Sequence, residues 1–288
     1  MVGNAGFFGF VACQKNENPP LSGFDLENSD ARAIEIADRV MEAMGGRKAW
    51  DETRYITWNF FGRRRHLWDK WTGNVRIEAG DRLILMNINT KQGRVWINGE
   101  EVTHPDSLQN HLEYGYRAWV NDSYWMFMPY KLKDTGVTLK YLGEGQMQNG
   151  RSADMLQLTF HQVGVTPQNK YLVYVDQKTQ LVGEWAYFRD ANDDSAMFHT
   201  PWDNWQRYGN ILLSDDRGRR KHADIAVCRF ARIAIHQSGA GGLAAIARPE
   251  RALTSDFTRY LRKKRRHNGT GALLDESAPP LPPFSSQK

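Results

Sequence analysis

The sequence predicts a mainly β protein of the α+β class, in which helices pack against an antiparallel sheet. Short segments rich in β-branched and aromatic residues follow one another at close intervals along most of the chain. Two segments instead repeat their apolar residues at the 3.6-residue spacing of an amphipathic helix. Strands joined by such short turns pair in the antiparallel direction, so we expect a sheet built from successive hairpins.

The first helix is predicted to begin after Ser29 or Asp30, because either side chain can cap a helix N-terminus. Gly45 and Gly46 follow the last apolar position and are predicted to end the helix. The apolar face, which we expect to lie against the sheet, consists of Ile34, Ala37, Met41 and Met44, widened by Ala33 and Val40.

A first group of strands follows this helix. The segment 55–61 places Ile56, Trp58 and Phe60 on one face, as expected for a half-buried strand. Asn98-Gly99 suits a tight hairpin turn, since both residues tolerate positive φ. The further strands are expected at 67–71, 75–78, 83–88 and 95–97.

A second helix interrupts the strands, beginning at Asp106 or Ser107 and ending near Asn121-Asp122. Strands then resume at 137–142 and 155–160. The clearest hairpin joins 171–175 to 181–188, because Asp176 can turn the backbone through its own carboxylate. The apolar side of the second helix consists of Leu108, Leu112, Tyr116 and Trp119.

The N-terminus has the pattern of a bacterial lipoprotein signal. An apolar run with small residues ends at Cys13, and a polar, proline-bearing segment follows it. We therefore predict a signal segment at 1–13, a tether at 14–28, and acylation of Cys13 that attaches the protein to a membrane, facing the periplasm and at the outer membrane rather than the inner one. The alternative is an apolar N-terminus with an ordinary cysteine.

The formal charge of +5 is confined to the C-terminal tail. Residues 228–288 hold 11 Lys and Arg against 4 Asp and Glu, whereas residues 1–227 hold 27 against 29. This separation argues against nucleic-acid binding by the domain predicted at 29–227. The tail is compatible with a basic surface patch, a disordered segment or translation out of frame, and we assign it no function.

Motifs for catalysis, metals and cofactors are absent from the sequence. It contains no Gly-x-Ser-x-Gly elbow, no phosphate-binding Gly-x-x-x-x-Gly-Lys loop and no Cys-x-x-Cys pair. The histidines lack the spacing of metal ligands. We therefore predict no catalytic residues, no metal and no cofactor. An envelope hydrolase using Asp154 or Glu184 stays as an alternative.

Aromatic and methionine side chains are abundant, with ten Trp in the chain. Singly, each is expected in the core. Together they can also wall an apolar cavity, since Met and Trp adapt to flexible chains. The candidates for this lipid cavity are Trp58, Phe60, Trp68, Trp96, Trp125, Met126, Met128 and Trp185.

The hairpin 174–182, with its Val-Asp-x-x-Thr-x-Leu pattern, resembles the LolA/LolB/LppX group of periplasmic lipid and lipoprotein carriers. The segment 121–134 is similar to an uncharacterised family of LolA-like bacterial lipoproteins. This resemblance covers 29–227 and implies a strongly curved antiparallel half-barrel with helices closing its concave face. It implies no catalytic residues.

These observations predict a membrane-tethered envelope lipoprotein that binds a lipid or lipoprotein acyl chain. The expected partners are the acyl chain and the membrane, with another envelope protein as a further partner. A non-catalytic protein-interaction module is the alternative from a different class, because a concave aromatic surface can also meet a protein.

Overall fold

The computed structural model describes residues 17–161 and 163–228. All of them belong to the compact unit Met1–Gly239. None of the helices in this part of the chain combines the length and apolarity that crossing a bilayer requires. The whole predicted signal segment with Cys13 lies outside the described residues, as does the tail beyond Cys228.

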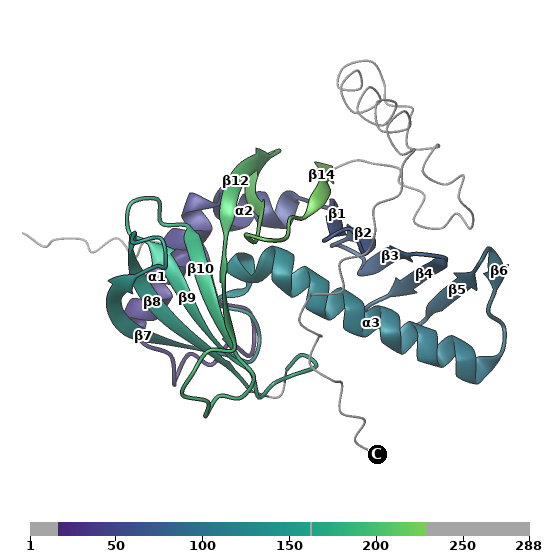
Figure 1. The fold of residues 1–288 in the computed structure, drawn as a ribbon, viewed down its shortest axis with the longest axis horizontal. Coiled ribbons are helices and arrows are strands. Elements are labelled where there is room, and N and C mark those ends of the chain that lie inside the picture. Colours follow the sequence, from purple (N-terminus) through teal and green to yellow (C-terminus); the bar gives the residue numbers. More distant parts are fainter. Residues whose placement is uncertain (1–16, 162, 229–288) are drawn as a thin grey trace, which may run out of the picture. The chain divides into compact units, whose positions relative to one another are not determined.

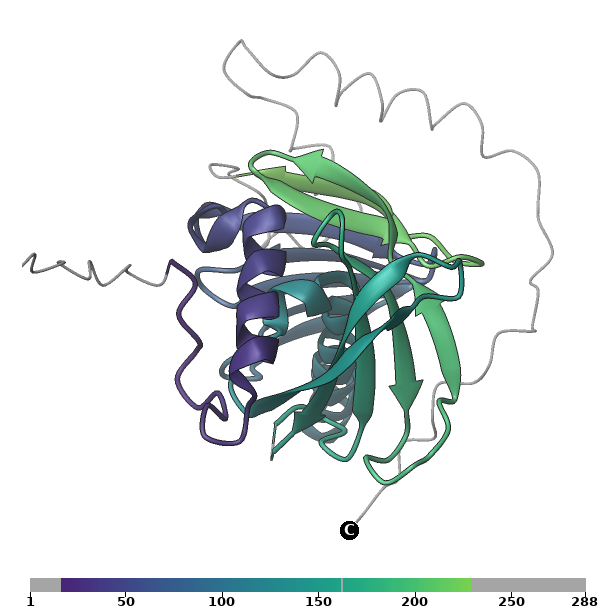
Figure 2. The same cartoon turned by 90° about the vertical axis from the view of Figure 1, so that its left-hand side faces the viewer.

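Two antiparallel sheets form the body of this unit (Figures 1 and 2). The order of the seven-stranded sheet is β14 (Ala223–Cys228), β1 (Tyr55–Phe60), β2 (Arg64–Asp69), β3 (Asn74–Ala79), β4 (Arg82–Asn87), β5 (Gly93–Ile97) and β6 (Glu100–Glu101). The order of the five-stranded sheet is β11 (Phe198–Pro201), β10 (Val182–Phe188), β9 (Lys170–Asp176), β8 (Ser152–Phe160) and β7 (Val137–Gln146). A separate hairpin consists of β12 (Asp203–Tyr208) and β13 (Ile211–Asp216).

The helices lie on the sides of the sheets that share the core. The α1 helix (Ala31–Ala43) buries Ile36 and Val40 against the five-stranded sheet, and the short α2 helix (Gly46–Glu52) buries Trp50. The long α3 helix (Pro105–Phe127) runs along the seven-stranded sheet in Figure 1 and contacts β4, β5 and β13. A 3-10 turn, Met128–Lys131, continues from its C-terminus.

One apolar core joins both sheets. Strand alternation directs Trp58 and Trp68 from the seven-stranded sheet, and Val173 and Trp185 from the five-stranded sheet, into the same cluster as α1 and the end of α3. The predicted fold class is therefore confirmed: the chain forms curved, mostly antiparallel sheets that are not closed, with helices on their inner side.

The predicted elements differ from the observed ones mainly at their ends. The second helix continues past Asp122 to Phe127, because Asp122 is buried and paired instead of ending the helix in solvent. The α2 helix follows Gly45 directly and was not predicted, nor were β11 to β14. The Asp176 turn is confirmed, since its Oδ1 accepts the N–H groups of Lys178 and Thr179, each at 2.9 Å.

The predicted tether, 14–28, is described from Glu17 onward, and this part lies against the domain. Phe24 is buried, and the backbone N–H of Leu21 donates to the carbonyl of Lys133. At the other end, β14 runs to Cys228, whose backbone pairs with Tyr55. The paired strand thus extends one residue past the predicted domain end at 227.

The joint between α1 and α2 is held against the β12–β13 turn. The carbonyl of Met44 accepts both the backbone N–H of Leu212, at 2.9 Å, and the Tyr130 hydroxyl, at 3.1 Å. A Cβ built on Gly45 would lie 2.3 Å from the carbonyl oxygen of Asn210. Glycine is therefore required at position 45 by close backbone approach as well as by its positive φ.

We predict that Gly45→Ala destabilises the protein more than Gly46→Ala does. Both glycines have positive φ, at 112° and 87°, but nothing lies within 4 Å of a Cβ built on Gly46. Gly46→Ala should therefore lower the free energy of unfolding only by the cost of a positive φ, about 1–2 kcal/mol. Gly45→Ala adds to this cost the clash with the carbonyl oxygen of Asn210. Denaturant unfolding of both variants measures this, and equal losses would contradict the close approach.

Candidate functional site

The C-terminal half of α3 carries aromatic side chains into the space between the two sheets. The Phe127 ring lies 5.0 Å from that of Trp58 and 5.8 Å from that of Trp68, both of the seven-stranded sheet. The Trp125 ring lies 4.9 Å from that of Trp185 in the five-stranded sheet. We call this set, Trp58, Trp68, Trp125, Phe127 and Trp185, the aromatic interior.

Most of the predicted cavity residues meet in or beside this interior. Phe60, Met126 and Met128 are buried in the same core cluster, and Trp125 is partly buried against it. Trp58, Met128 and Trp185 have no exposed surface at all. The residues brought together from the predicted set are Trp58, Phe60, Trp68, Trp125, Met126, Met128 and Trp185.

Trp96 is the member of the predicted set that lies elsewhere. Its neighbours on β5, Val95 and Ile97, face the core side, so the alternation of the strand turns Trp96 to the opposite face of the seven-stranded sheet. There the guanidinium of Arg94 stands 4.8 Å above its ring. Successive residues of a strand point to opposite faces, so an error of one position in the expected register places Trp96 on the wrong face.

Several polar atoms in the aromatic interior and on the aromatic residues beside it have no hydrogen-bond partner among the described residues. Buried indole N–H and phenol O–H groups ordinarily find a partner. Leaving such a group unpaired costs about 1–3 kcal/mol, so a group of them on adjoining rings marks this interior as unusual for a purely structural core. The unpartnered donors are Trp58 Nε1, Trp68 Nε1, Trp119 Nε1, Trp185 Nε1, Trp202 Nε1 and the Tyr124 hydroxyl.

A buried ionic cluster fixes α3 on the seven-stranded sheet at the edge of this interior. Arg64 of β2 donates to both carboxylate oxygens of Asp122, with Nε at 2.6 Å and Nη2 at 2.7 Å. His66 Nε2 lies 2.6 Å from Oδ2 of the same carboxylate, and its ring stacks on Trp58 at 4.6 Å. Asp122 and His66 are fully buried.

The electrostatics of this cluster keep Asp122 ionised. Burial by itself would raise the pKa of Asp122, but the hydrogen bonds from Arg64 and His66 outweigh it and hold the pKa below its ordinary value. The ionised carboxylate in turn raises the pKa of Arg64 against the opposing effect of burial. No local pattern in the sequence indicates this cluster, because Asp122 lies 56 residues from His66 and 58 from Arg64.

A second buried cation, Arg217, ties the end of α3 to the β12–β13 hairpin. Its Nη2 donates to the carbonyl of Trp125 at 3.0 Å, and its Nη1 donates to the Ser214 hydroxyl at 2.8 Å. The guanidinium also stacks on Trp202 at 3.5 Å. Burial lowers the pKa of Arg217 to about 9. A cation at the carbonyl end of a helix is favourable, so Arg217 acts as a C-terminal cap of α3.

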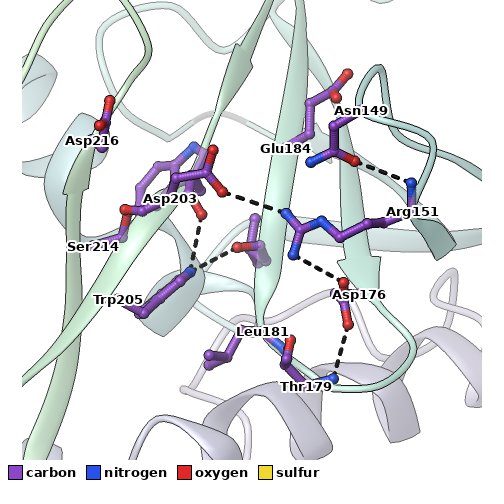
Figure 3. A network of polar contacts seen from close by, with 12 residues as sticks. Asn149, Arg151, Asp176, Thr179, Leu181, Glu184, Asp203, Trp205, Ser214 and Asp216 are labelled. Atoms are coloured by element: carbon purple, nitrogen blue, oxygen red, sulfur yellow. Dashed lines mark hydrogen bonds and ion pairs between the residues drawn. The ribbon is translucent and has the colours of Figure 1, made fainter.

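A polar network joins the turn between β7 and β8, the end of β9 and the start of β10 to strand β12 (Figure 3). Arg151 connects Asp176 at 3.1 Å with Asp203 at 3.4 Å. The Trp205 indole N–H donates to the carbonyl of Val182 at 2.9 Å. These contacts join the separate hairpin to the sheet, and we interpret them as structural.

The carboxylates of the hydrolase alternative are both buried and both engaged. Glu184 accepts the backbone N–H of Gln148 at 2.8 Å, and its Oε1 lies 2.7 Å from His199 Nδ1. Asp154 accepts the Tyr141 hydroxyl at 3.1 Å. Glu184 and Asp154 belong to different faces of the sheet, since Glu184 pairs with Tyr174 whereas Asp154 pairs with Val175.

No group of three or more His, Cys, Asp or Glu side chains suited to a metal ion occurs within residues 17–161 and 163–228. The arrangement that stands out chemically is therefore an aromatic interior with unpartnered donors, bordered by the Asp122 cluster.

No protein-family model matches the chain, and no curated protein matches it. Among solved structures, it is similar to a DUF1329 family protein from Desulfovibrio piger, with 11% identity and a TM-score of 0.35 over 74% of this chain and 98% of that one. It is also similar to the MucA/MucB complex of Pseudomonas aeruginosa, with 18% identity and a TM-score of 0.22 over 55% of this chain and 51% of that one. At these TM-scores neither similarity carries information on function.

We predict that Asp122→Asn destabilises the protein by about 3–5 kcal/mol, because it leaves the Arg64 cation buried without a counter-charge. The matched control is Glu101→Gln. Glu101 also holds an arginine, Arg94, with both carboxylate oxygens, but this pair is exposed, so its loss should change stability little. Denaturant unfolding at neutral pH compares the two variants.

The pH dependence of the stability difference between the parent and Asp122→Asn tests the charge of Asp122. Because the pKa of Asp122 is lowered in the folded state, its stabilising effect is present above the unfolded value of about 3.9 and is lost as pH falls through the folded value. The stability difference between the parent and Asp122→Asn should therefore narrow below about pH 4. A difference that stays constant in acid would show that the carboxylate acts through shape alone.

Proposed function

We propose that this protein is a binding protein of the cell envelope that takes the acyl chain of a lipid or lipoprotein into its aromatic interior. The observation that carries the proposal is the gathering of buried Trp, Tyr and Met side chains from both sheets around α3, with donors that lack partners. The resemblance of 174–182 and 121–134 to periplasmic lipid and lipoprotein carriers supports the same role.

An interior of this kind can hold a long chain without any charged contact. Each buried methylene contributes about 0.8 kcal/mol, so about ten methylenes contribute about 8 kcal/mol, the free energy of micromolar binding. Met126 and Met128 are flexible, polarisable side chains that can repack around a chain. The unpartnered indole and phenol groups can donate to the ester or amide carbonyls that connect acyl chains to their head groups.

Binding requires the walls of the interior to move apart, since Trp58, Met128 and Trp185 have no exposed surface. Unpartnered buried donors raise the free energy of this closed arrangement. The free-energy difference between the closed and open arrangements is therefore smaller, so that binding of an apolar chain can favour the open one. We infer that the rings of Tyr124 and Trp125 move away from Trp185, because the contacts that join these described side chains are aromatic.

Attachment to the membrane through acylated Cys13 is the second part of the proposal, with the domain facing the periplasm. We propose the outer membrane as the site of attachment. An acyl-binding domain tethered in this way would receive or deliver its cargo at the membrane surface instead of diffusing between membranes.

Mass spectrometry of organic extracts tests the binding role. The full chain is produced in a bacterial envelope and purified without detergent, and we expect a defined lipid at about one molecule per protein. A folded protein that carries no lipid, and that recovers one envelope protein in stoichiometric amount, would contradict acyl binding and support the protein-interaction alternative.

Photocrosslinking locates the bound chain. A fatty acid with a diazirine on its chain is incubated with the full-length protein and irradiated, and the labelled peptides are identified. We expect labels at Trp58, Trp68, Trp125 or Trp185 that excess unlabelled palmitate abolishes. Trp96 is the internal control, because it lies on the opposite face of the seven-stranded sheet. Labelling of Trp96 equal to that of the interior residues would contradict the proposed location.

A further inference from the structure

Trp71 is an exposed tryptophan held rigidly outward. It lies in the turn between β2 and β3, and 54% of it is exposed. Its backbone N–H donates to Asp69 Oδ1 at 3.1 Å, and its indole Nε1 donates to the carbonyl of Asp51 at 3.0 Å. The ring is thus fixed by polar contacts while much of its apolar surface faces solvent.

Arg54 joins Trp71 to a second aromatic side chain. Its guanidinium lies 5.0 Å from the ring centroid of Trp71 and 4.8 Å from that of Tyr55. Asp69 holds this guanidinium with both carboxylate oxygens, at 3.0 and 2.8 Å. We call Arg54, Tyr55 and Trp71 the interfacial surface.

The N-terminal segment enters the domain beside this surface. Arg47 of α2 donates to the carbonyl of Pro19 at 3.5 Å and holds the carboxylate of Asp51 at 2.8 Å. The backbone carbonyl of the same Asp51 accepts the Trp71 indole N–H. Arg47, which contacts Pro19, and Asp51, which contacts Trp71, are one helical turn apart on α2. Pro19 and Trp71 are therefore held at neighbouring positions of this helix.

Covalent geometry limits how far this edge can lie from a modified Cys13. Residues 14–16 separate Cys13 from Glu17, the first described residue. Even a fully extended chain spans at most about 3.6 Å per residue, which places Glu17 within about 15 Å of Cys13. With Cys13 acylated as proposed, its acyl group enters the hydrocarbon layer, and Pro19, Arg47 and Trp71 lie on the edge of the domain that this short connection enters.

We propose that the interfacial surface lies in the headgroup layer of the membrane to which Cys13 is anchored. This proposal rests on the anchoring part of the proposed function. Trp and Tyr concentrate at membrane interfaces, because each has an apolar body and a polar group. A protein partner fits less well, since a stable interface covers about 800 Å² on each side and a single exposed ring supplies a small part of that area.

The orientation predicts that lipid quenches Trp71 selectively. The protein is processed in a bacterial envelope, so that Cys13 is modified as the cell modifies it, and is reconstituted into phosphatidylcholine vesicles brominated near the headgroup end of the acyl chains. Tryptophan emission is then compared with that in unbrominated vesicles. We expect quenching of the parent to fall at least about two-fold in Trp71→Phe, because the other Trp residues on this side are buried.

Trp205→Phe is the matched control. Trp205 lies on β12 and packs partly buried against Trp202, and its indole N–H donates to the carbonyl of Val182. This variant should keep the quenching of the parent. Equal quenching in the parent and Trp71→Phe, no quenching in the parent, or an equal fall in both variants would overturn the proposal.

The intact mass of the purified protein separates this proposal from the anchoring on which it rests. If Cys13 carries no acyl group, anchoring fails, and the same protein is then added to preformed brominated vesicles. Quenching that Trp71→Phe alone removes would still support the interfacial surface, whereas its absence would overturn that surface as well.

Discussion

The burial of the C-terminal half of α3 between the two sheets is the constraint on which the other features depend. A helix with one apolar stripe can rest on a single sheet, but α3 presents Leu112 and Met126 to the core while its end inserts Tyr124 and Trp125 toward the five-stranded sheet. Its position is set by charge. The Asp122 carboxylate holds Arg64 and His66 of β2; Asp122 and His66 are fully buried, and the Arg64 side chain is 11% exposed.

Such a buried ionic cluster contributes little net stability but strongly disfavours any position that would leave one charge alone. Sliding α3 along the sheet would leave Arg64 and Asp122 unpaired in an apolar environment. Arg217 fixes the end of the same helix through the carbonyl of Trp125. The helix is therefore held by polar contacts on the seven-stranded sheet and on the hairpin, while its contacts with Trp185 are aromatic.

The proposed binding role and the proposed membrane orientation fit one arrangement. Trp50 lies beneath the edge that carries Trp71, and its ring stacks on Tyr130 at 4.1 Å and lies 5.6 Å from Phe127. The aromatic interior thus continues to the edge of the domain where the N-terminal segment enters. A chain leaving the bilayer at this edge would meet aromatic side chains along its whole path to Trp58.

The sequence by itself determined the elements whose signals are local: the α1 helix, the alternation of Ile56, Trp58 and Phe60, and the Asp176 turn are present as expected. The face of α1 differs at one position, since Ile36 is fully buried whereas the predicted Ile34 is partly buried. It also indicated most of the aromatic interior, since bulky apolar residues are buried wherever they alternate toward a core. Only the tertiary structure decided which face each strand turns inward, as Trp96 illustrates, and that Asp122 continues a helix instead of ending it. The physical reason is that burial of a charge depends on partners distant in sequence, and no local pattern encodes Arg64 and His66 meeting Asp122.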